Sequence, residues 1–183
     1  IDAGEAAAVA LILDGASIAS AAGPAIEGRS ADDVAIWMAP GSVNSVSDAA
    51  SYAADAGANA AIYVDADLAI SGPGSLSVTG NGNDGIASTD DLAVLAGVIT
   101  VRAADDALRG KDALVVSGGT LDLQARAGDG LRSDQADDPA RGYILVSGGD
   151  IAIEAGDADA QAQTDVVITA GSISAAVSDD GVK

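Results

Sequence analysis

The sequence predicts an all-β fold, a parallel β-solenoid in which each coil takes about 22 residues. Three observations support this prediction: a repeated strand pattern, glycines at regular intervals, and an apolar composition with little bulk. Hydrophobic residues make up 49% of the 183 positions, yet the chain has no Phe, one Trp and three Tyr. Ala, Val, Ile and Leu can fill only a thin interior at native packing density, and a narrow stack of coils has such an interior.

Five segments repeat one pattern, in which alternating apolar residues lie on both sides of a small residue and a glycine. The segments are LAISGPGSLSV from Leu68, LAVLAGVITV from Leu92, LVVSGGTLDL from Leu114, ILVSGGDIAI from Ile144 and VVITAGSISA from Val166. Their central glycines, at intervals of 23, 22, 30 and 22 residues, are Gly74, Gly97, Gly119, Gly149 and Gly171. An apolar period of two predicts β-strands. Strands this short are unstable as isolated hairpins, so each is expected to pair with its counterparts in the neighbouring coils.

A third apolar position lies six residues before a copy of the pattern, as at Ile62, Ile86 and Leu108. Each coil should therefore hold three short strands joined by tight turns. Residues 44–60 and 134–142 lengthen two coils, and we expect both insertions to form surface loops. By length, residues 1–183 form a single domain. The chain starts within a coil and stops just after a corner, so we expect a fragment of a longer protein, with end coils on which another unit could stack.

The charge of the chain excludes some classes of partner. The formal net charge is −20, and 25 of the 28 acidic residues are Asp. Asp is favoured where a short side chain bonds turn backbone or binds a hard cation. Eight basic residues cannot neutralise many phosphates, so we expect no nucleic-acid partner. No stretch of 18 apolar residues occurs, so we expect no membrane span.

Aspartates recur at the glycine-bearing corners, as in NDGIASTDD, DDALRGKD, GDGLRSD and DDGV. Equivalent residues of successive coils stack at about 4.8 Å. A first column of carboxylates should then contain Asp84, Asp106, Asp129, either Asp157 or Asp159, and Asp180. A second column should contain Asp67, Asp90, Asp91, Asp112, Asp134 and Asp165. Two stacked carboxylates repel by roughly 3–4 kcal/mol at an effective dielectric constant of about 20, so both columns need counter-charges.

Three kinds of counter-charge are considered. Water and sodium could screen the columns, and Arg109 and Arg132, at equivalent positions of two coils, could pair with them. Calcium prefers six to eight oxygen ligands, and carboxylates of successive coils, with turn carbonyls freed by Gly85 and Gly130, would supply them. We favour Ca²⁺. The predicted metal ligands are Asp84, Asp90, Asp91, Asp105, Asp106, Asp112, Asp129, Asp134, Asp157, Asp159 and Asp180.

Several stretches resemble a family of secreted bacterial calcium-binding, carbohydrate-binding proteins, and the likeness extends from about Val9 to the end of the chain. The stretches include NSVSDAASY, GNGNDGIASTDDLAV, AADDALRGKDALVVSGGTLDL and AQTDVVITAGSIS. The resemblance implies a right-handed single-stranded parallel β-helix, a secreted or cell-surface location and binding of pectin-like or cellulose-like polymers. It also implies calcium ligands at Asp84, Asp105, Asp106 and Asp129. The chain departs from the family at GDADA, where another GDGI corner is usual.

These observations together predict a non-catalytic, calcium-dependent module that binds or adheres to an acidic or plant-type polysaccharide such as polygalacturonate or cellulose. A calcium ion held by aspartates would bridge to sugar oxygens, and Arg109, Arg132 and Tyr52 are the predicted ligand contacts. Two alternatives stay open. One is a pectate-lyase-like enzyme with Arg109 or Arg132 as the base, since the chain has no His. The other is a rod or surface protein that calcium only stabilises.

Overall fold

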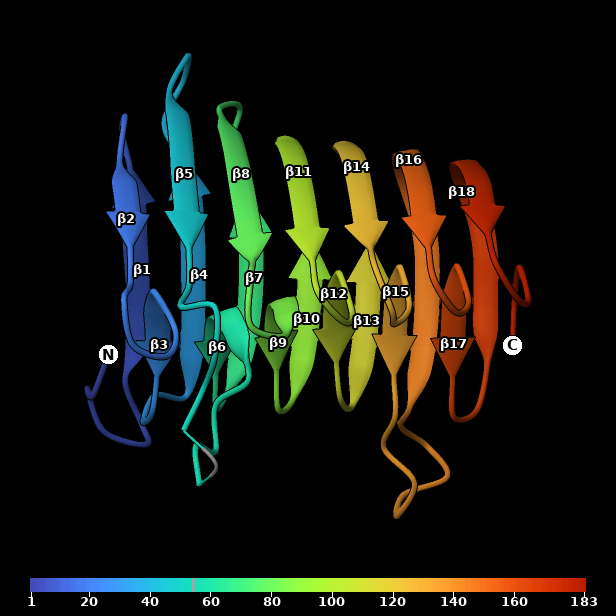
Figure 1. Ribbon diagram of the computed structural model, residues 1–183, viewed down its shortest axis with the longest axis horizontal. Helices are drawn as coiled ribbons and strands as arrows, with labels where there is room; N and C mark the ends of the chain where they lie inside the picture. Colours follow the sequence, from blue (N-terminus) through green and yellow to red (C-terminus); the bar gives the residue numbers. More distant parts are fainter. Residues whose placement is uncertain (54) are drawn as a thin grey trace.

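The computed structural model describes residues 1–53 and 55–183 as parallel β-strands curled around a narrow core (Figure 1). Ala54, within the first predicted insertion, lies outside the described residues. The described part of the chain contains no helix, and therefore none long and apolar enough to cross a membrane. The all-β class and the parallel arrangement predicted from the repeats are confirmed.

The strands follow one another in sets of three, so that each set contributes one strand to each of three faces. The first face holds β1 (Ala8–Leu13), β4 (Asp33–Met38), β7 (Asp67–Ser71), β10 (Asp91–Val94) and β13 (Ala113–Val116). The second face holds β2 (Ser17–Ala19), β5 (Val43–Ser47), β8 (Ser75–Gly80), β11 (Val98–Ala103) and β14 (Thr120–Ala125). The third face holds β3 (Ile26–Gly28), β6 (Ala60–Val64), β9 (Asp84–Ser88), β12 (Leu108–Gly110), β15 (Leu131–Ser133) and β17 (Ala160–Ala162). The longer strands β16 (Tyr143–Ala155) and β18 (Val166–Val177) continue from the first face onto the second.

Stacked apolar columns form the core. On the first face Leu68 pairs with Leu92, Leu92 with Leu114 and Leu114 with Ile144. These four side chains are at most 1% exposed. Full burial of one such side chain contributes roughly 1.5–3 kcal/mol, so repeating it in each coil holds the stack together. The same parallel pairing brings every corner next to the equivalent corners of the coils before and after it.

Glycines with a positive φ form a second column, at the corner between the first and second faces. Gly97, Gly119, Gly149 and Gly171 have φ between 93° and 112°. A Cβ on Gly119 would lie 2.9 Å from the carbonyl oxygen of Gly97 on the preceding coil, so any side chain would also crowd the backbone. In the coil with one extra residue the positive φ is at Gly72, although Gly74 is the glycine aligned with Gly97. The extra residue widens that turn and moves the left-handed position.

The two predicted insertions connect neighbouring strands. The first is shorter than expected, because residues 43–47 form β5 and leave 48–59 to link β5 to β6. Residues 134–142 connect β15 to β16. Both segments run out beyond the ends of the third-face strands in Figure 1.

Replacing Gly119 by Ala should lower the free energy of unfolding by roughly 1–3 kcal/mol, because Ala is strained at a φ of 101°. Gly57→Ala is the matched control, since a Cβ there has nothing within 4 Å. Denaturant unfolding of both variants measures the difference. Equal stabilities would show that the glycine column is not required for close stacking.

Candidate metal centre

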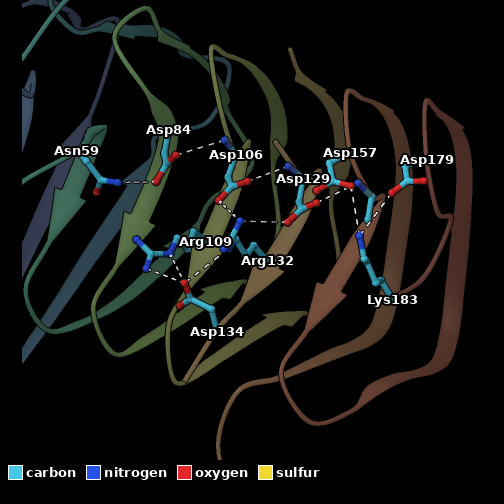
Figure 2. A network of polar contacts seen from close by, with 11 residues as sticks. Asn59, Asp84, Asp106, Arg109, Asp129, Arg132, Asp134, Asp157, Asp179 and Lys183 are labelled. Atoms are coloured by element: carbon cyan, nitrogen blue, oxygen red, sulfur yellow. Dashed lines mark hydrogen bonds and ion pairs between the residues drawn. The ribbon is translucent and has the colours of Figure 1, made fainter. Parts of the chain in front are cut away.

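Three aspartates of the first predicted column stack at one corner of the molecule (Figure 2). Asp84 begins β9, and Asp106 and Asp129 lie two residues before β12 and β15. Because the register pairs the strands they precede, the three residues occupy one position on successive coils. They are 1%, 3% and 0% exposed, respectively. The column was predicted correctly for these three coils.

Each carboxylate of the column uses one oxygen to bond the next coil. Asp84 Oδ1 accepts the backbone N–H of Asp106 at 3.2 Å, and Asp106 Oδ1 accepts that of Asp129 at 2.8 Å. Asp129 Oδ1 accepts the N–H of Ala158 at 2.9 Å. A short side chain is needed for this contact, which explains why Asp rather than Glu occupies these corners. The second oxygen, Oδ2, is left to meet a counter-charge or another donor.

The fourth coil departs from the column. Ala160 pairs with Leu131, which puts Ala158 rather than Asp157 or Asp159 next to Asp129. The Asp159 side chain is 4% exposed, burial raises its pKa, and its Oδ1 has no partner in the described residues. Asp180 lies at the position of the column, because it precedes Val182 by two residues and Val182 pairs with Ala160. Ala158, on the coil between them, separates Asp180 from Asp129. This corner has one residue fewer than the GDGL corner, because Ala155 and Ala160 are five positions apart where Ala125 and Leu131 are six apart, and Ala158 takes the column position.

Arginine and lysine neutralise parts of the column. Arg132 Nη1 lies 3.4 Å from Oδ2 of both Asp106 and Asp129. Further along the stack, Lys183 Nζ lies 3.6 Å from Asp157 and 3.4 Å from Asp179. Arginine therefore supplies the counter-charge between Asp106 and Asp129, as one of the three alternatives proposed.

The first part of the column lacks such a counter-ion. Asp84, Asp105 and Asp106 each offer one carboxylate oxygen, and these oxygens lie within 4.8 Å of one another. Among the described residues no Lys or Arg forms an ion pair with Asp84 or Asp105, and the other neighbour of Asp84 is Asn59, whose amide donates to Oδ2 at 3.0 Å. An ion 2.3–2.6 Å from each ligand can join oxygens up to roughly 5 Å apart. The three carboxylates could therefore bind a metal ion without a large rearrangement.

The surroundings favour the protonated form of these carboxyls. Burial and then the charge of Asp106 raise the pKa of Asp84 to about 7. Burial also raises the pKa of Asp106 to about 6, against the opposing effects of the Asp129 N–H and the Arg132 guanidinium. Burial raises the pKa of Asp129 as well. A bound cation would stabilise the ionised forms and reverse these shifts.

The glycines of the DG corners have a different role from the one predicted. A Cβ on Gly85 would lie 2.3 Å from Val101, and a Cβ on Gly130 would lie 2.3 Å from Ile153. The carbonyl of Gly130 accepts the N–H of Leu108 at 3.2 Å. These glycines are thus required because their position faces the core.

The second predicted column divides into two groups. The backbone N–H of Asp91 donates to Asp67 Oδ1 at 3.0 Å, and both residues line a shallow groove of about 450 Å³ with Asp90, Asp112 and Arg141. Burial and then neighbouring carboxylates raise the pKa of Asp90 and of Asp91. The groove is acidic along one side and carries a guanidinium on the other.

Two other members of the second column, Asp112 and Asp134, contact cationic side chains, whereas Asp165 forms no ion pair among the described residues. Asp112 is ion-paired with Arg141 and accepts the amide of Gln135 at 2.9 Å. Asp134 accepts Arg109 Nη2 at 2.8 Å and lies 3.5 Å from Arg132 Nε. These two carboxylates already have counter-ions from the protein, and metal binding at them stays a prediction.

Tyr52, in the first insertion, is linked through Asp48 to the backbone just before Asp84. Its hydroxyl donates to Asp48 Oδ2 at 2.6 Å, and burial raises the pKa of Tyr52. Asp48 is 4% exposed and also accepts the backbone N–H groups of Asn81 and Gly82, just before Asp84. The sequence interpretation missed Asp48, which no repeat marks. It also missed Asn59, although this residue lies three positions before Ile62 just as Asp105 lies three before Leu108.

Comparisons with known proteins agree with this architecture. A family model described as carbohydrate-binding domain-containing protein matches residues 1–182. A protein of that description from Acetivibrio thermocellus is 37% identical over 107 residues, which cover 56% of this chain and 37% of the relative's length. A solved structure of the polysaccharide lyase-like protein from C. thermocellum, a gadolinium derivative, has a TM-score of 0.96 at 34% identity, covering 98% of this chain and 74% of that one. The chain therefore belongs to the family of carbohydrate-binding domain-containing proteins.

Proposed function

We propose that the chain is a non-catalytic, calcium-dependent module that binds an acidic polysaccharide outside the cell or at its surface. The observation that carries the proposal is the group formed by Asp84, Asp105 and Asp106, whose carboxylate oxygens are close enough to share one ion. Among the described residues, Asp84 and Asp105 have no protein counter-ion. In this proposal the fold is a right-handed parallel β-helix with coils of about 22 residues. Its exposed end coils would allow a further unit to stack.

The donor set suits calcium. Three carboxylates offer one oxygen each, and calcium takes six to eight at flexible angles, so several positions remain for water, backbone or sugar oxygens. Gadolinium, present in the derivative of the similar structure, is likewise a hard cation with a preference for oxygen. Calcium at millimolar concentration outside cells would fill a site of modest affinity. An ion held in this way would let an acidic protein surface bind a sugar carboxylate.

A groove next to the metal centre could hold the glycan. It encloses about 330 Å³ and is lined by Asn59, Tyr63, Arg109 and Lys111, among others. Asn59 links the groove to the metal centre through its bond to Asp84. Arg109 uses Nε and Nη2 for Asp134, which leaves Nη1 for a ligand. Tyr63 offers a half-buried ring against which a sugar could pack.

The arginines near the metal centre are poorly suited to act as a base. Burial lowers the pKa of Arg132, but the charges of Asp106, Asp129 and Asp134 outweigh this effect and leave the pKa raised. Arg109 donates two hydrogen bonds to Asp134, so its guanidinium is already engaged by a carboxylate. The raised pKa of Arg132 and the ion pair of Arg109 favour binding over proton abstraction, so the lyase is the second candidate.

Asp84→Asn should lower calcium affinity at least tenfold, because the group loses one of its three carboxylates. Isothermal titration calorimetry in chelator-treated buffer measures the change. Asp14→Asn is the control, since Asp14 is exposed and lies outside the metal centre. If the two variants bind calcium equally, the assignment of this centre is wrong.

Removing calcium should weaken polygalacturonate binding at least tenfold, and restoring calcium should recover it. Affinity electrophoresis in gels with and without chelator gives this comparison. In parallel, absorbance at the wavelength of unsaturated uronides should stay flat. Binding that is unchanged in chelator would exclude the calcium bridge, and a rise in absorbance that Arg109→Ala abolishes would favour the lyase.

Stability should depend on pH in opposite ways with and without calcium. Without metal, the folded state binds more protons than the unfolded state between pH about 4 and 7, because the folded pKa of Asp84 is about 7. The free energy of unfolding should thus fall by a few kcal/mol as pH rises from 5 to 8, at about 1.4 kcal/mol per unit of pKa shift. Calcium should remove this fall, because it binds the ionised form. Asp84→Asn in chelator should flatten the profile; a profile as steep as that of the unaltered chain would contradict the assignment.

A further inference from the structure

Two arginines lie together on the second face, away from the aspartate column. Arg102 is on β11, and Arg126 directly follows β14. The register pairs Arg102 with Gln124, so the two guanidinium groups come from neighbouring coils, offset by two residues. Both arginines are exposed. Neither belongs to the repeated corner motif.

These arginines differ from the other four in their surroundings. Arg29, Arg109, Arg132 and Arg141 each form an ion pair with an Asp or Glu. Among the described residues, neither Arg102 nor Arg126 forms an ion pair or a side-chain hydrogen bond, although the chain carries 28 acidic residues. Two guanidinium groups thus keep all their donors on one surface of a strongly acidic protein.

The surface between them is a groove. It has a volume of about 570 Å³, and the two arginines, Gln124 and Glu154 line it. Its floor is made of small residues, including Ala103, Ala125, Ala155 and Gly156. A floor of this kind lets a flat ring approach the sheet closely, with polar side chains around it. Grooves with a small apolar area and a few convergent polar groups are common ligand sites.

We infer that this groove binds the carboxylate of an acidic saccharide directly, without a metal ion. A guanidinium matches a carboxylate with two parallel hydrogen bonds, and this geometry is stronger than a neutral hydrogen bond. The Gln124 amide and the Glu154 carboxylate would bond the hydroxyl groups of the sugar. The inference rests on the proposed function in one respect only, that the chain binds carbohydrate.

The groove adjoins the metal centre around one corner. Arg102 lies three residues before Asp105, and Arg126 three before Asp129, so their Cα atoms are at most roughly 11 Å apart along the chain. One polysaccharide could therefore contact both places. Two linked contacts raise the overall affinity for a long polymer far above that for a short one. The net charge of −20 does not prevent this, because charges beyond about 8 Å are largely screened at physiological salt.

The test is a titration of the chain with trigalacturonate in chelator, followed by the side-chain Nε–H signals of its six arginines in NMR spectra. The signals of Arg102 and Arg126 should shift, and binding should weaken at least tenfold as salt rises from low to high concentration. The double variant R102Q/R126Q should lose at least tenfold in affinity. R29Q is the matched control, because Arg29 is exposed but paired with Glu27.

The outcomes separate the two proposals. Equal binding by R102Q/R126Q and the unaltered chain, or no binding in chelator, overturns the arginine groove and leaves the calcium bridge standing. Binding in chelator that the double variant loses supports the groove even if calcium proves irrelevant. Cellotriose and a sulfated trisaccharide complete the titration: binding of either one in place of trigalacturonate overturns the assignment to carboxylates. A cooperative thermal unfolding transition of R102Q/R126Q in chelator, at the same temperature as that of the unaltered chain, shows that the double variant is folded.

Discussion

Parallel stacking in register is the constraint on which the rest of this structure depends. It buries columns of Leu, Ile and Val at nearly zero exposure, and the same geometry brings like charges together wherever a corner carries Asp. The coils cannot slide to relieve that repulsion, because a shift of one residue would turn the apolar side chains out of the core. The repulsion must instead be relieved where it arises, by hydrogen bonds and counter-charges at the corner.

The molecule meets this requirement in different ways along one edge. Each aspartate bonds the backbone of the following coil through one oxygen, which ties the coils together and leaves the other oxygen for a counter-charge or another donor. Arg132 forms ion pairs with Asp106 and Asp129, and Lys183 forms an ion pair with Asp157 on the last coil. The step at Asp84 and Asp105 keeps an unbalanced negative charge. A site with unbalanced charge and raised carboxyl pKa values is where a divalent ion gains most.

Much of the fold could be predicted because two independent features of the repeat agree. The apolar period of two predicts the strands, and the glycine intervals predict how many residues separate equivalent strands. The stacking of Asp84, Asp106 and Asp129 followed from that register alone. The column could not be extended to Asp157 or Asp159, because the corner lengths differ by one residue between these coils and the register places Ala158 next to Asp129.

The ion pairs were harder to predict than the strands. A long arginine side chain can reach several carboxylates, so its partner depends on its rotamer and on the path of nearby loops. A repeat encodes neither, so the pairing of Arg109 with Asp134 and of Arg141 with Asp112 could not be predicted. Arg102 and Arg126 escaped notice because they lie outside the corner motif and because an arginine on a strand looks like ordinary surface. Only the structure reveals that, among the described residues, they form no ion pair while the other four arginines do.

The column of left-handed glycines has a consequence for how such a protein can diversify. A side chain on Gly119 would meet the carbonyl of Gly97, and one on Gly171 would meet that of Gly149, so the coils lie close here and the turns that separate first-face from second-face strands are only three or four residues long. Both insertions emerge at the other two corners. Changes in loop length during evolution are thereby directed to the two corners that border the third face. New surface features therefore accumulate beside the aspartate column, while the corner between the first and second faces keeps its shape.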